Sequence, residues 1–129
     1  MLDVVRSELL SQYGFPNAVS LRTGGVSGPP FDTGNLVLAS SVGDRVDAVN
    51  ENRSRFAAAL GVSLARLYEV SQVHGVQVVT IQGTEPVQSV RVVEADALVL
   101  APLPRSEAVA VGVRVADCMP ILVADRASG

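Results

Sequence analysis

Apolar residues recur at spacings of three and four between Asp44 and Leu60, which is the period of an amphipathic helix. The seam contains Val46, Val49, Arg53, Phe56 and Leu60. We predict a helix over this range, with Asp44 as its N-cap and Gly61 just past its end. Arg53 lies on the buried stripe, where a carboxylate or several carbonyls are expected to hold it, because an unpaired buried charge is costly.

Short apolar runs, separated by glycine, proline and acidic residues, predict strands along most of the remaining chain. The runs are Ala18–Leu21, Leu67–Val73, Val76–Ile81, Val90–Val93, Ala97–Leu100, Ala108–Val115 and Ile121–Ala124. Leu2–Leu10 fits either a short amphipathic helix or a first strand. Strands follow strands more often than they alternate with helices, so we predict an α+β fold with mixed sheets flanked by helices.

The length of 129 residues suits one domain, residues 1–129. The last two predicted strands are followed only by the turn-like Asp125–Gly129, with no further element to cover them. We therefore expect a partial domain, incomplete at its C-terminus: either a fragment or a half-domain that another piece completes.

The composition excludes several classes of function. The chain is 48% hydrophobic and 18% charged, with a net charge of −3, which gives no electrostatic footprint for nucleic acid or an anionic membrane. All ten basic residues are arginine, which removes Schiff-base chemistry and the P-loop lysine. A single cysteine forms no internal disulfide, and charges in the first ten residues argue against a signal peptide. A soluble cytoplasmic protein is predicted.

His74 and Cys118 are the only histidine and the only cysteine, and each follows a predicted strand. They fit two ligands of a zinc ion, or a nucleophile–base pair in which His74 stabilises the thiolate. A buried cysteine and a turn histidine without function remain equally open. The loop Arg22–Pro30 fits an anion cradle of one guanidinium and successive amides, although turn-forming glycines explain it as well. Asp96 and Asp117 are candidates for a base, a partner of His74, or the counter-ion of Arg53.

Six segments resemble, in the same order, the motifs of one known family. They are Arg22–Ser27, Asn35-Leu36, Val42–Arg53, Gln72–Gly75, Glu94–Leu98 and Ala116–Pro120. Among them the chain matches Arg-x-Gly-Gly-Val-Ser, Gln-Val-His-Gly and Ala-Asp-Cys-x-Pro. The family is the YfiH-like laccase-domain family, once labelled multicopper polyphenol oxidases and now associated with zinc-dependent purine nucleoside phosphorylase activity.

The resemblance implies a zinc site and a substrate class. His74 and Cys118 would be two zinc ligands and, with Arg22, the catalytic residues, while Arg22, Asn35 and Gln72 would bind substrate. Purine nucleosides and phosphate would be the substrates, and adenosine deamination a second activity. The family's third ligand lies in a His-Ala-Gly-Trp-Arg-Gly segment that is absent from this chain, which has one histidine and no tryptophan. The resemblance therefore covers the N-terminal portion of the family's domain.

Two other hypotheses stay open at this point. A Cys118/His74 thiol hydrolase without metal would use the same two side chains as nucleophile and base. A non-catalytic piece would instead pair its exposed strands with another chain, through self-association or with a completing partner.

Overall fold

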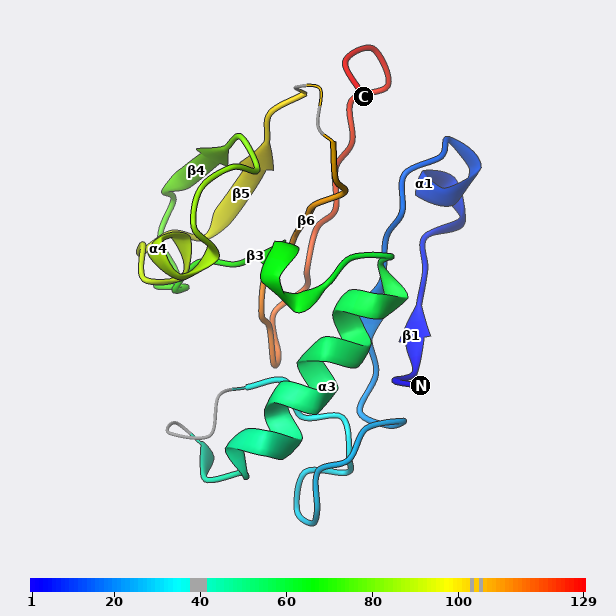
Figure 1. Ribbon diagram of the computed structural model, residues 1–129, viewed down its shortest axis with the longest axis vertical. Helices are drawn as coiled ribbons and strands as arrows, with labels where there is room; N and C mark the ends of the chain where they lie inside the picture. Colours follow the sequence, from blue (N-terminus) through cyan, green and yellow to red (C-terminus); the bar gives the residue numbers. More distant parts are fainter. Residues whose placement is uncertain (38–41, 103, 105) are drawn as a thin grey trace. The chain divides into compact units, whose positions relative to one another are not determined.

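A computed structural model describes residues 1–37, 42–102, 104 and 106–129 (Figure 1). The chain forms two compact units, Met1–Leu64 and Ala65–Gly129. A short 3₁₀ turn, η1 (Leu64–Arg66), leads from the first unit into the second. The prediction of a single domain over residues 1–129 stays a prediction.

The first unit begins with a short strand and a short helix, the two alternatives that the pattern of Leu2–Leu10 left open. β1 (Val4–Val5) pairs antiparallel with β2 (Val19–Ser20), and α1 (Glu8–Gln12) lies between them in the chain. The Ser7 hydroxyl accepts a hydrogen bond from the Leu10 amide and so caps α1. The strand predicted over residues 18–21 is confirmed in its central part.

The main helix of this unit, α3, runs from Val46 to Ala59. Its buried face includes Val49 and Arg53, as the periodicity predicts, whereas Val46 is exposed. The residue after the C-cap, Gly61, has a φ of +77°, which confirms its place past the helix end. The predicted N-cap is wrong by one residue: Arg45 occupies that position without a side-chain cap, and the Asp44 carboxylate accepts the Arg45 amide and the Ser27 hydroxyl instead.

The second unit contains two parallel strand pairs. β3 (Leu67–Tyr68) pairs with β6 (Ala110–Val111), and β4 (Val78–Ile81) pairs with β5 (Ala97–Leu100). The chain crosses from β4 to β5 through α4 (Val87–Arg91), which makes a compact β-α-β unit (Figure 1). The α+β prediction is confirmed, with two-stranded pairings as its sheets.

The core of the second unit explains one wrong prediction. Its buried residues are Tyr68, Val70, Ile81, Val87, Val90 and Ala95. Val87 and Val90 lie one helical turn apart and both reach this core, so packing overrides the strand preference of Val90–Val93. Ile121–Ala124 is also not a strand in the described part of the chain, and three of its four residues are exposed.

No helix among the described residues is long and apolar enough to cross a membrane.

Candidate functional site

One buried side chain of α3 organises the glycine-rich loop of the first unit. Asn52 has no exposed surface, and its Oδ1 accepts the Val26 amide at 2.8 Å. Its Nδ2 lies 2.9 Å from each of three acceptors: the Ser27 hydroxyl, the Thr33 carbonyl and the Asn35 carbonyl. Both sides of the loop are therefore fixed by the same amide group.

A buried carboxylate extends this network. Asp44 Oδ2 accepts the Ser27 hydroxyl at 2.6 Å and Asn35 Nδ2 at 2.9 Å. These two bonds, with Ser27 contributing more, lower the pKa of Asp44 below its ordinary value of 3.8. Asn35 Oδ1 in turn accepts the Val37 amide at 3.0 Å. Both polar atoms of the predicted substrate-binding Asn35 thus have partners inside the protein.

The loop's amides are engaged within the chain as well. Gly25 N–H donates to the Thr33 hydroxyl at 3.2 Å and Ser27 N–H to the Thr33 carbonyl at 2.9 Å, while Val26 N–H binds Asn52. A cradle of these three successive amides, as the sequence predicts, would require breaking three bonds. Arg22 is exposed, and its guanidinium pairs with the Asp32 carboxylate.

His74 lies at the tip of an exposed loop in the second unit. Its backbone is left-handed, with a φ of +59°, which is uncommon for a residue with a Cβ. The Asp96 carboxylate holds this turn: Oδ1 accepts the His74 amide at 2.7 Å, and Oδ2 accepts the Gly75 amide at 2.6 Å. Gln72 precedes the turn and is half-buried.

Cys118 is an exposed free thiol in the irregular segment that follows β6. Imidazole and thiolate are donors that zinc prefers, and both side chains are open to solvent, so their chemistry fits zinc. A catalytic zinc site uses three protein donors. Among residues 1–37, 42–102, 104 and 106–129 there is no group of three or more His, Cys, Asp or Glu side chains placed to hold a metal ion.

The predicted site residues divide between the two units. Arg22 and Asn35 belong to residues 1–64, whereas Gln72, His74 and Cys118 belong to residues 65–129. Sequence reasoning did not find the part played by Asn52. A sequence signal for it exists, because Asn52 is four residues before Phe56 and three after Val49, on the buried side of the predicted helix.

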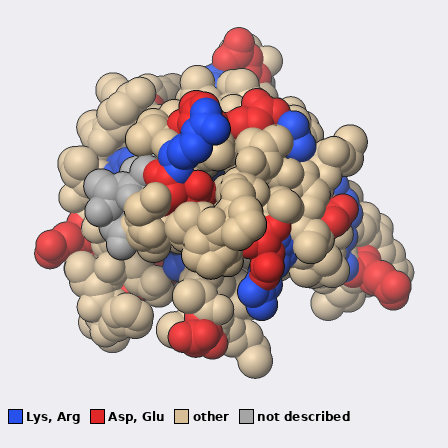
Figure 2. Space-filling model, turned by 90° about the horizontal axis from the view of Figure 1, so that it is seen from below, with Lys and Arg blue, Asp and Glu red and all other residues tan. Residues whose placement is uncertain are grey.

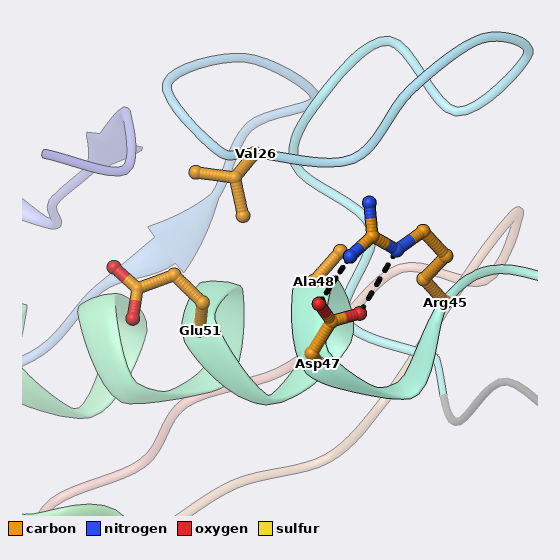
Figure 3. A pocket seen from close by; sticks show the side chains of 5 residues that line it. All are labelled: Val26, Arg45, Asp47, Ala48 and Glu51. Carbon is orange, nitrogen blue, oxygen red and sulfur yellow. Dashed lines mark hydrogen bonds and ion pairs between the residues drawn. The ribbon is translucent and has the colours of Figure 1, made fainter.

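A separate hollow of about 270 Å³ lies where α3 begins (Figure 3). The described residues that line it are Val26, Arg45, Asp47, Ala48 and Glu51. The Arg45 guanidinium turns onto the Asp47 carboxylate and, as the largest cause, lowers the pKa of Asp47. Basic and acidic side chains also lie next to one another on the face in Figure 2.

A comparison with protein families shows which family the chain resembles. Residues 16–129 match the model of the family described as multi-copper polyphenol oxidoreductase laccase. The chain belongs to this family. Its description implies a metal-binding domain, and the extent of the match agrees with the resemblance carried by the six sequence motifs.

Curated relatives give the family a second description. A purine nucleoside phosphorylase of Mycobacterium tuberculosis is 44% identical over 108 residues, which are 84% of this chain and 40% of that protein. One of Streptomyces coelicolor is 38% identical over 122 residues, covering 92% of this chain and 44% of the relative. The purine nucleoside phosphorylase YfiH of Shigella flexneri is 37% identical over 123 residues, covering 92% and 46% respectively.

A solved structure supports the fold. The crystal structure of YlmD from Geobacillus stearothermophilus matches 60% of this chain and 30% of that chain, with a TM-score of 0.51 and 28% identity. The YfiH-like fold is therefore confirmed. The chain spans less than half the length of the curated relatives described above, an extent that fits an N-terminal portion of the family's domain.

Proposed function

We propose that this chain carries part of the active site of a zinc-dependent purine nucleoside phosphorylase. The observation that carries the proposal is the 36% to 44% identity to curated relatives of that name. The exposed imidazole of His74 and the exposed thiol of Cys118 support it, because they are the donor types that zinc prefers. The third donor would come from residues outside this chain.

Phosphorolysis joins a phosphate oxygen to the anomeric carbon of the nucleoside as the bond from that carbon to the purine nitrogen breaks. In this proposal the Arg22 guanidinium binds and orients phosphate through paired N–H donors. Phosphate would then displace the Asp32 carboxylate, which pairs with Arg22 in its absence. Asn35 and Gln72 would line the nucleoside, Asn35 through the loop that it stabilises. Bound zinc would supply Lewis acidity at the reacting centre.

A second activity, hydrolytic deamination of adenosine to inosine with release of ammonia, belongs to the same proposal. It would use the same His74 and Cys118 donors, since a Lewis acid also activates hydrolysis. The adjacent carboxylate, Asp117, is exposed and lies next to Cys118 in the chain, where it would accept a proton.

The test is phosphate-dependent release of free base from inosine and adenosine by the protein at the full length of its relatives. Cys118→Ala and His74→Ala are each expected to lower kcat/KM by at least about a hundredfold and to remove zinc, as measured by elemental mass spectrometry. Asn50→Ala, at an exposed position of α3, is the control. Base release that is unchanged by removal of zinc, or by both substitutions, would refute the proposal.

A further inference from the structure

The loop that carries His74 is an insertion in a parallel ladder. Ser71 pairs with Glu94, and the next paired positions are Val78 and Ala97. Two residues, 95–96, separate these positions on one strand, whereas six residues, 72–77, separate them on the other. The extra residues cannot follow the ladder, so they form a loop with His74 at its tip.

The base of this loop is closed by backbone hydrogen bonds. The Ser71 carbonyl accepts the Ala95 amide at 3.0 Å, and the Gln77 carbonyl accepts the Asp96 amide at 3.0 Å. The short connection between Glu94 and Ala97 is thereby fixed against both ends of the loop. Since Ala95 is completely buried, this connection is the rigid side of the arrangement.

The Asp96 side chain then reaches the tip. It bonds the amides of His74 and Gly75 with one oxygen each, and both bonds are charge-assisted. An ideal Cβ placed on Gly75 would lie 3.2 Å from Asp96 Oδ2, so the glycine permits this close approach. The two bonds select the left-handed backbone of His74, a conformation that the residue would otherwise seldom adopt.

We infer that Asp96 is a positioning residue: its carboxylate holds the His74 turn so that the imidazole is presented for metal binding. This inference rests on the proposed function, which assigns His74 as a zinc ligand. Asp96 acts through the backbone of His74, not through the imidazole, and therefore leaves both ring nitrogens available. Pre-organisation of this kind reduces the ordering that a metal would otherwise impose on an exposed loop.

The experiment uses the protein at the full length of its relatives, because the proposed third zinc donor lies outside residues 1–129. The imidazole NMR signals of His74 are assigned by their loss in His74→Ala. Zinc is titrated while these signals are followed in wild type, Asp96→Asn, Asp96→Ala and Glu94→Gln. Glu94→Gln is the control. Glu94 is exposed and pairs with Ser71 through its backbone, so this substitution removes one negative charge and leaves both bonds from Asp96 to the His74 turn intact. Amide hydrogen exchange of His74 and Gly75 is measured in parallel without metal.

We expect Asp96→Asn to weaken zinc binding at His74 by about tenfold, Asp96→Ala by more, and Glu94→Gln by less than about twofold. Exchange at the His74 and Gly75 amides should rise in both Asp96 variants while the β4 and β5 amides stay protected. A purely structural role would instead raise exchange across β4 and β5 and leave the zinc affinity of the folded chain unchanged, which would overturn the inference.

Failure of the proposed function gives a different result. If zinc shifts no His74 imidazole signal in the wild-type protein at the full length of its relatives, which includes the proposed third donor, His74 is not a zinc ligand, and the positioning role falls together with that assignment. If zinc binds wild type through His74 and Asp96→Asn binds equally well, the proposed function stands and the inference is overturned.

Discussion

Replacing Asn52 tests how strongly α3 organises the glycine-rich loop. Asn52→Ala removes an amide that contacts four polar groups: the Val26 amide, the Ser27 hydroxyl, and the carbonyls of Thr33 and Asn35. Asn52 itself is completely buried, so water does not readily take its place. The Ser27 hydroxyl still bonds Asp44 and the Thr33 carbonyl still accepts the Ser27 amide, so the cost of an unsatisfied group is concentrated on the Val26 amide and the Asn35 carbonyl.

The expected magnitude follows from the number of bonds. The Oδ1 atom accepts one bond, and the two N–H groups of Nδ2 supply two full bonds shared among three acceptors. Three hydrogen bonds at about 1 kcal/mol each give a loss of about 3 kcal/mol. Alanine is a better helix former than asparagine by roughly 0.5 kcal/mol, which offsets part of that loss. We therefore expect Asn52→Ala to lower the free energy of unfolding by about 2.5 kcal/mol.

Urea unfolding followed by circular dichroism measures this change. Asn50→Ala is the matched control, because it makes the same substitution at an exposed position of the same helix and is expected to be neutral or slightly stabilising. Asn52→Asp keeps the size of the side chain but loses its donors, and should be at least as destabilising as alanine. A loss below about 1 kcal/mol for Asn52→Ala relative to Asn50→Ala would refute the reasoning.

Two further predictions concern close packing and acid stability. Gly25→Ala places a Cβ on the Thr33 carbonyl oxygen and should lower the free energy of unfolding by about 2 kcal/mol. Gly28→Ala is the control and should be neutral, because the space around Gly28 is open. Equal midpoints of urea unfolding for the two variants would contradict this prediction. Hydrogen bonds from the backbone amides of residues 82–84, above all that of Gln82, lower the pKa of Glu85 below 4.5. The ionised Glu85 carboxylate therefore stabilises the folded state above pH 4.5, and this contribution is lost as the pH falls through the lowered pKa. Glu85→Gln should therefore reduce the acid-dependent loss of stability below pH 4.5, and Glu94→Gln should keep it.

Much of the fold follows from local patterns. The α3 seam is a strong signal because burial there repeats at the helical period, and the glycine after its end marks where the helix stops. The β5 run is a continuous apolar segment that forms a strand as predicted. The Val90–Val93 run misled the prediction because a short apolar run is consistent with either element. What decides it is Pro86 before Val87, together with a core that accepts both Val87 and Val90 on one helical face.

The candidate site is less accessible to sequence reasoning. The motifs identify His74 and Cys118, yet the bond between the Asp96 carboxylate and the His74 turn depends on strand register, which no local pattern encodes. The partners that the loop amides find in Thr33 and Asn52 are likewise tertiary contacts that the sequence does not reveal. The cytoplasmic location, the absence of nucleic-acid binding and a completing partner chain stay predictions.

The Asn52 network also has a consequence for folding order. Its bonds join residues separated by 17 to 26 positions in the chain, so the loop cannot reach its final conformation before α3 docks against it. The entropy of closing these loops is lost before the contacts form. Protection of the Val26 amide against hydrogen exchange during refolding therefore reports when α3 docks. The loop conformation around Arg22 should form in the same kinetic step.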